Sequence, residues 1–580
     1  MTAAGHVAPR RRPGAGAEAA ANADAPTAHA VRAAARETLG FRRLLPGQEE
    51  AVRAVLAGRD TLALLPTGGG KSAIYQLAAV ERPGPTVVVS PLLALQQDQL
   101  ESLDDERLGG AAALNSTLSD ARRAEVLEAF AAGRLEFLLL APEQLAIPEV
   151  LDRVADAHPS LFVVDEVHCV SEWGHDFRPE YRRLAAVAEA IGRPPILGLT
   201  ATASPAVRDE IAEWLRLRDP VVVARGFDRP NLRLSVETHA DGRAKRRALV
   251  EWVVAATPPG IVYVATRRGA EEVAAELSAA GVTAAVYHAG LAAGTRARIQ
   301  DDFMADRIGV VVATIAFGMG IDKPNVRFVA HHDISDGLDA YHQEIGRAGR
   351  DGEPADAVLF YRAEDLGLRR FQGAPAVVTE ADARAVVAAL RRRPGAATTE
   401  VAKAARRSVR RTDAIVGRLE ALGTVSVEPN GSVHVVTDRD ARQLAADVVA
   451  AQDRRRRMAA SRVEMLRAYA EGAGCRRRFL LNYLGEEYEP PCGNCDRCLA
   501  ADGRVTSADG SATDAATDAD RADVAGGPFA LNDRVRHATY GPGLVSRVEG
   551  DRVVVQFDDA GYRTLALGEC LERGLLRRAD

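Results

Sequence analysis

The glycine-rich loop at residues 66–72, Pro-Thr-Gly-Gly-Gly-Lys-Ser, constrains the fold of this chain more than any other segment. It follows the apolar run at residues 62–65 and precedes a stretch of helical character, so it predicts a strand, a loop and a helix in direct succession. Three consecutive glycines let the backbone curl with its N–H groups pointing inward, and the N-terminus of the next helix adds positive potential. The loop therefore favours a bound anion such as a phosphate.

The lysine and serine of this loop are suited to a nucleoside triphosphate. Lys71 would reach the β and γ phosphates, and the Ser72 hydroxyl would hold Mg²⁺. A compact ammonium fits between phosphates where a planar guanidinium does not, and the chain otherwise takes nearly all its positive charge from arginine. Position 65 is Leu where the strict pattern has Gly, which leaves a glycine-rich turn beside a core strand as the alternative. We predict that ATP is bound by Thr67, Gly68, Gly69, Gly70, Lys71 and Ser72.

Length and charge bound the remaining possibilities. The 580 residues are too many for one core and suggest roughly three to five domains. No run approaches the roughly 18 apolar residues of a membrane span, and the N-terminus lacks the apolar stretch of a signal peptide. We expect a cytoplasmic, nucleoid-associated protein without a membrane partner. The net charge of −6 hides an arginine-rich stretch at residues 391–478, which is the candidate surface for nucleic acid.

Short apolar runs alternate with longer amphipathic stretches between residues 30 and 370. Runs of four or five apolar residues without alternation predict strands that are buried on both faces, and hence parallel sheets covered by helices. The expected strands lie at residues 62–65, 87–89, 137–140, 161–164, 196–199, 261–264 and 310–312.

Two carboxylates follow the fourth of these runs directly. Asp165 and Glu166 would lie at the carboxyl end of a buried strand, downstream of the glycine-rich loop by about one domain core. This position suits a water-bridged ligand of Mg²⁺ (Asp165) and a base that orients the attacking water (Glu166). His168 is placed to report the γ-phosphate to neighbouring segments. An Asp-Glu pair in a solvated turn is the alternative.

Several motifs in order resemble those of superfamily 2 helicases. They are residues 165–168 (Asp-Glu-Val-His), 199–203 (Leu-Thr-Ala-Thr-Ala) and 343–352 (Gln-Glu-Ile-Gly-Arg-Ala-Gly-Arg-Asp-Gly). The aromatic-rich stretch at residues 169–181 and the stretch at residues 316–329 resemble the RecQ family of ATP-dependent DNA helicases in particular. The resemblance covers residues 35–365 and resumes at residues 440–499.

This resemblance implies an α/β fold with two RecA-like parallel-sheet lobes and ATP in the cleft between them. Gln343, Arg347 and Arg350 of the second lobe would complete the catalytic set, with both arginines neutralising charge on the γ-phosphate. Gln48 matches the family's adenine-reading glutamine, and Phe41 matches the ring that stacks on the base. Leu45 stands where the family usually has an arginine, so one contact near the nucleotide is missing.

The resemblance also implies residues that couple hydrolysis to single-stranded DNA. Exposed aromatic rings stack on bases without regard to sequence, and an aromatic-rich loop in polar company fits that use better than a packed core. The predicted loop residues are Trp173, His175, Phe177 and Arg178. Shorter matches make Asn115, Arg267 and Thr314 candidate contacts of the phosphate backbone.

A winged helix is predicted after the second lobe. Helices are expected at residues 379–390, 399–405 and 409–422, and two valine-rich strands flank Pro429-Asn430-Gly431, which is a strong hairpin signal. The family normally carries such a domain after its cysteines. We hypothesise that the hairpin around Asn430 supplies the strand-separating element, against the alternative of a structural insertion with a charged surface.

Four cysteines predict a structural zinc site. Cys492, Cys495 and Cys498 form two overlapping Cys-x-x-Cys steps, and Cys475 on a preceding helix would close a tetrahedral thiolate site. The spacing matches the RecQ zinc module. Cys169 and Cys570 are predicted to be buried apolar residues rather than ligands.

An acid-leaning linker and a small barrel end the chain. The barrel resembles the Tudor-like barrel at the C-terminus of UvrD-type helicases, and such barrels usually dock a protein partner. The long linker favours an untethered barrel over a stabilising appendage. The expected regions are a disordered tail (1–30), RecA-like lobes (31–222 and 223–370), a winged helix (376–437), a zinc module (440–500), a linker (501–527) and the barrel (528–580).

The function that this resemblance implies is an ATP-dependent DNA helicase that moves 3′ to 5′ on single-stranded DNA and unwinds tailed duplexes in DNA repair or recombination. The implied cofactors are ATP, Mg²⁺ and Zn²⁺. An RNA helicase or a translocase that does not unwind is the first alternative. A DNA-binding scaffold with ATP as a switch is the second.

Overall fold

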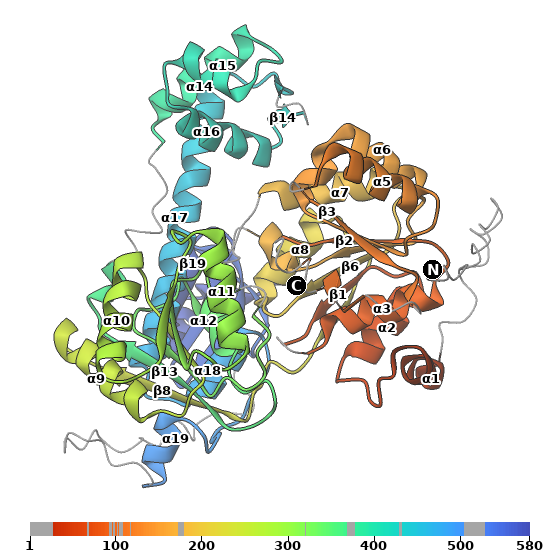
Figure 1. Ribbon diagram of the computed structural model, residues 1–580. Helices are drawn as coiled ribbons and strands as arrows, with labels where there is room; N and C mark the ends of the chain where they lie inside the picture. The colour runs from red at the N-terminus through yellow and green to blue at the C-terminus, as the bar shows by residue number, and fades with distance from the viewer. Residues whose placement is uncertain are drawn as a thin grey trace. The chain divides into compact units, whose positions relative to one another are not determined.

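The computed structural model of the chain is shown in Figure 1. It describes residues 27–66, 69–91, 96, 99–100, 102–103, 108–115, 118–171, 179–318, 321–367, 378–428, 432–503 and 528–579. Residues 1–26 of the expected N-terminal tail (1–30) and most of the linker at residues 501–527 lie outside these ranges, whereas Ala28–Ala30 already belong to helix α1 (Ala28–Leu39). The chain divides into two compact units, Met1–Arg233 with Val254–Val329 and His342–Ala357, and Leu234–Val253 with Ala330–Tyr341 and Val358–Asp580.

The first sheet has seven strands in the order β3-β4-β2-β5-β6-β1-β7, and every pair in it is parallel. Five of its strands, β1, β2, β4, β5 and β6, are buried on both faces, as their lack of alternation predicts. Helices α2 and α3 lie on one side of it, and α5, α6 and α7 lie on the other (Figure 1). The strands are β1 (Thr61–Leu64), β2 (Thr86–Val89), β3 (Ala111–Leu114), β4 (Phe137–Leu140), β5 (Leu161–Val164), β6 (Ile196–Thr200) and β7 (Val221–Ala224).

The helices of this lobe bury apolar faces against the sheet. A continuous core joins α1, α2 and α3 to alternate residues of the strands, including Ala63, Val88 and Val163. This core fixes the strand ends that carry the nucleotide loop and the carboxylates. The α-helices are α1 (Ala28–Leu39), α2 (Gln48–Leu56), α3 (Lys71–Glu81), α5 (Asp120–Ala131), α6 (Pro148–Asp156), α7 (Leu184–Ala190) and α8 (Pro205–Trp214).

The second sheet has six strands in the order β10-β11-β9-β12-β13-β8, and the pairs β10–β11 and β11–β9 are parallel. The two predicted apolar runs in this region are β9 and β11. The strands are β8 (Leu232–Thr238), β9 (Gly260–Tyr263), β10 (Ala284–Tyr287), β11 (Val310–Ala313), β12 (Phe328–His331) and β13 (Ala355–Tyr361). The helices are α9 (Gly242–Ala255), α10 (Arg267–Ala279), α11 (Ala293–Met304) and α12 (Leu338–Ile345).

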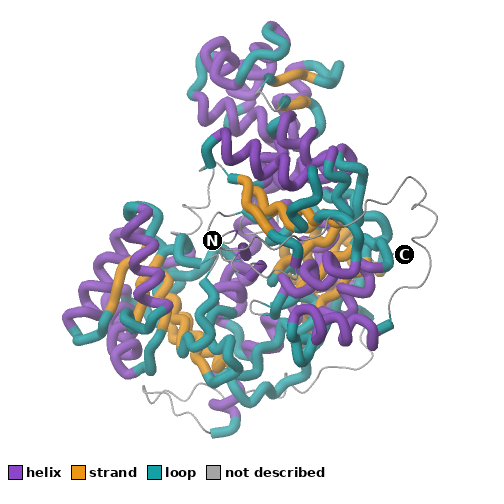
Figure 2. Tube along the Cα trace, turned by 45° about the vertical axis from the view of Figure 1, so that its right-hand side comes forward, coloured by secondary structure: helices purple, strands orange, loops and turns teal. Residues whose placement is uncertain are grey.

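Three helices and a hairpin follow, as predicted for a winged helix. They are α14 (Glu380–Arg392), α15 (Thr398–Ala405), α16 (Val409–Ala421), β14 (Val425–Val427) and β15 (Val433–Val435). The strands pair antiparallel with Val425 opposite Val435. The hairpin tip with Asn430 lies outside the described residues. Figure 2 shows this group from a second side, with its short strands beside the helices.

The long helix α17 (Ala441–Glu471) completes the core of the winged helix. Its first turns bury Leu444, Ala445 and Val448 in the same apolar cluster as α14 and α16. The side chain of Gln452 is buried and exchanges two hydrogen bonds with the backbone of Val378, at 2.9 and 3.1 Å. The helices α18 (Arg476–Tyr483) and α19 (Asp496–Ala501) follow it.

The C-terminal domain is a five-stranded antiparallel sheet in the order β19-β18-β17-β16-β20, with its own apolar core. Its elements are β16 (Arg534–His537), β17 (Gly541–Glu549), β18 (Arg552–Phe557), β19 (Gly561–Ala566), α20 (Leu567–Glu572) and β20 (Leu576–Arg578).

The expectation of an untethered barrel is wrong. The Arg547 guanidinium lies 4.0 Å from the centre of the Phe479 ring, and the rings of Tyr562 and Tyr483 are 5.4 Å apart. Asn532 donates a hydrogen bond of 3.1 Å to the carbonyl of Gly485. The domain therefore packs on α18 and the segment after it, and these contacts hold it in place at the far end of the linker.

None of the helices in the described ranges combines the length and the apolar character that crossing a membrane requires.

Candidate active site and zinc centre

The nucleotide loop lies between β1 and α3, as the sequence predicts. Gly70 takes a left-handed conformation (φ 62°) directly before Lys71, which is the first residue of α3. The N–H of Gly69 donates a hydrogen bond of 2.8 Å to the carbonyl of Pro66, which closes the turn. Lys71 and Ser72 thus sit in the first helical turn, where backbone N–H groups are free of helical partners and favour phosphate. Thr67 and Gly68 lie outside the described residues.

Gln48 connects this loop to the segment before α2. Its side chain is 3% exposed, and its Nε2 donates to the carbonyls of Gly69 and Gly70 at 3.0 and 2.8 Å. Its Oε1 accepts from the N–H of Leu45 at 2.7 Å. The glutamine predicted to read adenine therefore also positions the loop.

An open hollow of about 590 Å³ lies beside Leu45. Leu45 is itself exposed, and the arginine expected at that position is absent. The lining nevertheless includes four other arginines and the ring predicted to stack on the base. These residues are Arg32, Arg36, Arg42, Arg43 and Phe41.

Asp165 is a buried carboxylate at the end of β5. Its Oδ2 accepts from Nε2 of Gln99 at 2.7 Å, and its Oδ1 accepts from the N–H of Glu166 at 2.9 Å. Burial and the neighbouring Glu166 charge raise the pKa of Asp165 to about 6, although Lys71 opposes the shift. Gln99 was not predicted, because nothing in its local sequence distinguishes it from a solvated glutamine.

Glu166, His168 and Thr200 form a connected group. Glu166 takes a left-handed conformation (φ 45°, ψ 46°), and its Oε2 lies 3.3 Å from Nδ1 of His168. The same Nδ1 lies 2.9 Å from Oγ1 of Thr200 at the end of β6. Burial lowers the pKa of His168, but Cys169 and Glu166 outweigh it and hold that pKa well above its ordinary value. The predicted motifs at residues 165–168 and 199–203 are thus in direct contact.

The two arginine side chains of the predicted motif at residues 343–352 are buried. Nη1 of Arg347 donates to the carbonyl of Gly318, and Nη1 of Arg350 donates to the carbonyl of Ile321 at 2.7 Å and to Asp322 at 2.6 Å. Burial and the nearby Arg347 lower the pKa of Arg350 to about 10. Gln343 is also buried, on α12.

Two predicted DNA contacts share one edge of the second sheet. Arg267 begins α10 after β9, and Thr314 follows β11 and donates its N–H to the carbonyl of Tyr287 at 3.2 Å. His288, which was not predicted, follows β10, the edge strand next to β11. A Cβ placed on Gly290 would lie 3.0 Å from Nη1 of Arg267 and 3.2 Å from Nδ1 of His288, so both side chains gather at this edge.

Of the other predicted DNA contacts, the structure describes only Asn115. Asn115 directly follows β3 at the edge strand of the first sheet. The loop residues Trp173, His175, Phe177 and Arg178 lie outside the described residues.

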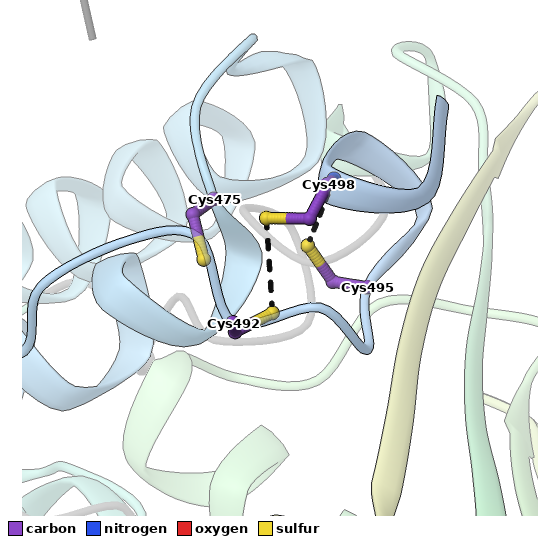
Figure 3. A group of neighbouring side chains, drawn as sticks. All are labelled: Cys475, Cys492, Cys495 and Cys498. Carbon is purple, nitrogen blue, oxygen red and sulfur yellow. Dashed lines mark hydrogen bonds between the residues drawn. The ribbon is translucent and has the colours of Figure 1, made fainter. Parts of the chain in front are cut away.

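The four predicted zinc ligands converge (Figure 3). Their Sγ atoms all lie within 4.8 Å of one another, and the four side chains point toward a common centre. Cys475 precedes α18 and Cys495 precedes α19, so two helix starts present two of the sulfurs. The N–H of Asn494 donates to Cys492 and that of Cys498 donates to Cys495, both at 3.5 Å. Hydrogen bonds from neighbouring thiols hold the pKa of Cys495 far below its ordinary value. Four cysteine sulfurs that converge in this way fit Zn²⁺, which four thiolates bind without an open position.

An ion pair between a buried arginine and a half-buried aspartate supports this cluster. Arg476 is 2% exposed, and its Nε and Nη2 lie 3.1 Å from the two carboxylate oxygens of Asp496. Its Nη1 donates to the carbonyls of Tyr469, Ala470 and Gly472 at the end of α17. Asp496 also accepts from the N–H of Val236 in β8 at 3.3 Å. Cys169 and Cys570 are buried and stand apart from the cluster, as predicted.

Comparison with known proteins decides the family. Residues 45–211 match the DEAD/DEAH box helicase family, residues 244–352 the helicase conserved C-terminal domain, and residues 438–499 the RecQ zinc-binding family. The chain is 37% identical over 465 residues to the probable ATP-dependent DNA helicase RecS of Bacillus subtilis, covering 79% of this chain and 89% of that protein. The chain belongs to the RecQ family.

The chain spans less than two thirds of the length of some other RecQ relatives. The ATP-dependent DNA helicase RecQ of Haemophilus influenzae is 34% identical over 466 residues, which cover 80% of this chain and 62% of that protein. Among solved structures, the DUF1998 helicase MrfA bound to DNA and AMPPNP is 16% identical with a TM-score of 0.50, over 72% of this chain and 63% of that one. That likeness concerns the fold. The chain is an ATP-dependent DNA helicase of the RecQ type with a zinc module.

Proposed function

We propose that this RecQ-type helicase moves 3′ to 5′ along single-stranded DNA and unwinds tailed duplexes during DNA repair or recombination, acting on the nucleoid. The observation that carries the proposal is the connected group of Glu166, His168 and Thr200 beside the nucleotide loop. A general base that served ATP hydrolysis alone would not need to be connected to the end of another strand. Through this connection, the presence or absence of the γ-phosphate can change the conformation of segments outside the nucleotide site.

Glu166 would orient the attacking water and accept its proton. The left-handed backbone conformation of Glu166 places its carboxylate beside His168. Such strained backbone positions are frequent at catalytic sites. When Glu166 takes up a proton, its attraction for the His168 ring falls. The hydrogen bond between His168 and Thr200 then changes, and with it the segment that leads into α8.

Mg²⁺ is part of the proposal, with Ser72 and Asp165 as its protein contacts. The residues fit the ion, since Asp165 is a buried carboxylate whose pKa is raised by burial and by the neighbouring charge of Glu166, and a cation beside it would offset both effects. When bound, Mg²⁺ would offset the charge of the phosphates. Lys71 would bind the β and γ phosphates, and Phe41 would stack on the base.

The second lobe would supply Gln343, Arg347 and Arg350. Both guanidiniums are held by carbonyls of the segment at residues 318–322, so they are preorganised rather than mobile. Arg267 and Thr314, with His288, would hold the phosphates of the DNA strand, together with Asn115 and the aromatic loop at residues 173–178. A protein partner of the C-terminal domain would use a face other than the one packed on α18.

The test is strand displacement on duplexes with a 3′ or a 5′ single-stranded tail, with ATP and Mg²⁺. The intact protein should displace the strand from the 3′-tailed duplex, and Lys71→Ala should abolish both displacement and ATP hydrolysis. Displacement only from the 5′-tailed duplex would refute the polarity. ATP hydrolysis that RNA stimulates more than DNA would point to an RNA helicase.

A further inference from the structure

Helix α12 begins with a buried carboxylate that the zinc module satisfies. Asp339 lies in the first turn of α12, and its side chain is buried. The hydroxyl of Tyr483, the last residue of α18, donates a hydrogen bond to Oδ2 of Asp339. Burial and the nearby charge of Asp339 hold the pKa of Tyr483 well above its ordinary value, so the hydroxyl stays protonated and remains a donor. Because a buried carboxylate is unfavourable without such partners, this hydrogen bond holds the first turn of α12 in place.

The C-terminal domain packs on the same tyrosine. The buried ring of Tyr562 in β19 lies 5.4 Å from the ring of Tyr483, centre to centre, with 32° between the ring planes. Gly561 precedes Tyr562, and a Cβ added at Gly561 would overlap the side chain of Ser461 on α17. This close approach of β19 to α17 fixes the position of Tyr562 relative to the zinc module.

A second series of ring contacts joins α12 to the C-terminal domain. The ring of Tyr341 on α12 lies 5.4 Å from that of Tyr469 on α17, and the Tyr469 ring lies 5.7 Å from that of Phe479 on α18. The guanidinium of Arg547 in β17 packs over the Phe479 ring. Two separate series of contacts therefore run from the C-terminal domain through the zinc module to the start of α12.

The same helix leads directly into the arginine motif. Gln343 lies one turn after Asp339, on the same face of α12. The N–H of Arg347 donates to the carbonyl of Glu344 at 3.3 Å, so the helical turn continues past Ile345, the last residue of α12. A short helix moves as a rigid body, and a shift of its first turn is therefore passed on to Gln343 and Arg347.

We propose that Tyr562 and Tyr483 are positioning residues for ATP hydrolysis. Through Asp339 they hold α12, and with it Gln343 and Arg347, in the geometry that the reaction requires. A misplacement of about 1 Å at a reacting group can cost about 10²-fold in rate, so support of this helix affects catalysis without any contact to the nucleotide. The C-terminal domain thus contributes to the rate of hydrolysis. This inference rests on the proposed function, which assigns Gln343 and Arg347 to the catalytic set.

The first test measures ATP hydrolysis by the full chain with Mg²⁺ and saturating single-stranded DNA. Tyr562→Ala should lower kcat about five- to tenfold and leave KM for ATP within about twofold, because the loop with Lys71 is untouched. Rates are divided by the concentration of sites that bind a fluorescent ATP analogue, so that unfolded protein does not count. Asn532→Gly is the matched control, since it removes another docking contact of the same domain, the hydrogen bond to Gly485. Glycine readily adopts the left-handed conformation of Asn532 (φ 67°), and this variant should change neither constant.

The second test asks whether Tyr562 acts through Tyr483. Tyr483→Phe removes the hydroxyl that Asp339 accepts from and should lower kcat, again with little change in KM. Tyr562→Phe keeps the ring and should restore most of the kcat that Tyr562→Ala loses. The double variant Tyr483→Phe with Tyr562→Ala should be no slower than the slower single variant, because residues that act in series do not have additive effects.

The outcomes separate this inference from the proposed function. Arg347→Ala is the reference and should lower kcat at least as much as Tyr562→Ala. If Arg347→Ala keeps full hydrolysis, the proposed function fails. If Arg347→Ala loses hydrolysis while Tyr562→Ala matches Asn532→Gly, only this inference is overturned. Additive losses in the double variant would also overturn it, since the two tyrosines would then act independently.

Discussion

The nucleotide site and the cysteine cluster both keep ionisable side chains away from water, but they do so in opposite ways. At the nucleotide site, Asp165 and Glu166 are adjacent carboxylates, and the pKa of Asp165 is raised to about 6. At the cysteine cluster, Arg476 is matched by both oxygens of Asp496 and by three carbonyls. At the first site, the repulsion between the two carboxylates stays uncompensated until a ligand binds. At the second site, the charges are already paired, and only the four thiolates require a zinc ion. This difference distinguishes a catalytic site from a structural site.

The largest expected effect is the loss of zinc. Binding of structural zinc contributes on the order of 10 kcal/mol in small modules, so Cys495→Ser should unfold α18 and α19 locally. The contacts of Phe479 and Tyr483 with the C-terminal domain should be lost with them. Hydrogen exchange should show loss of protection there and not in β1 or β5. If α18 and α19 stay protected from hydrogen exchange after complete removal of zinc, the zinc site does not have a structural role.

The second effect is catalytic. Glu166→Gln should lower the rate of ATP hydrolysis by about 10²- to 10⁴-fold, because it removes a general base. Its free energy of unfolding should change little, because the loss of the like charge beside Asp165 offsets the loss of the interaction with His168. Enzyme assays and thermal unfolding together measure this, with the exposed Glu149→Gln as a control that should change neither. A parallel loss of stability would show that the charge has a structural role.

The third effect tests the ion pair beside the cysteines. Arg476→Ala removes a buried guanidinium and leaves the half-buried Asp496 without its partner, so it should cost about 2–4 kcal/mol of unfolding free energy. Arg467→Ala removes an exposed pair with Glu471 and should cost less than about 1 kcal/mol. Denaturant unfolding followed by zinc release compares the two variants. Equal costs would mean that Arg476 contributes no more than a surface pair.

The fourth effect is a pH dependence at the nucleotide site. The folded pKa of Asp165 lies above its ordinary value, so the folded chain holds this proton more tightly than the unfolded chain. The resulting stability is full below about pH 4 and is lost as the pH rises through about 6. Asp165→Asn avoids this loss, and its advantage over the unaltered protein should grow by about 2–3 kcal/mol from pH 4 to pH 7. Thermal unfolding without nucleotide or Mg²⁺ measures it, and an advantage that does not change with pH would refute the shift.

The smallest effect concerns the C-terminal domain. Arg547→Ala removes the guanidinium that lies over the Phe479 ring and should weaken the docking by about 1–2 kcal/mol. Proteolysis in the linker at residues 504–527 followed by gel filtration would detect release of the domain. The exposed Arg573→Ala is the control. If neither variant promotes release, the ring contact does not secure the domain.

Much of the site was predictable because its signals are local. A glycine loop between a strand and a helix, two carboxylates after a buried run, and cysteines at two- and sixteen-residue intervals each follow from short-range chemistry. Gln99, His288 and Arg476 gave no such signal. Each becomes important only through residues far away in the chain, such as Asp165 for Gln99 and Asp496 for Arg476.

The C-terminal domain shows the same limit. Its strands were predictable from their alternation, but its attachment was not, because the linker gives no information on the rings of Tyr562 and Tyr483. Likewise, the three helices of the winged helix were predictable, whereas the completion of their core by α17 was not.

By itself, the sequence determined the chemistry of this protein: a phosphate loop, a pair of carboxylates and four thiols, since local spacing and backbone preference decide these. Only the tertiary structure decided how they are connected. Burial sets the pKa of Asp165, and the meeting of β5 with β6 links His168 to Thr200. Packing on α18 fixes the last domain. Desolvation and long-range contacts depend on which surfaces meet, and no short stretch of residues encodes that alone.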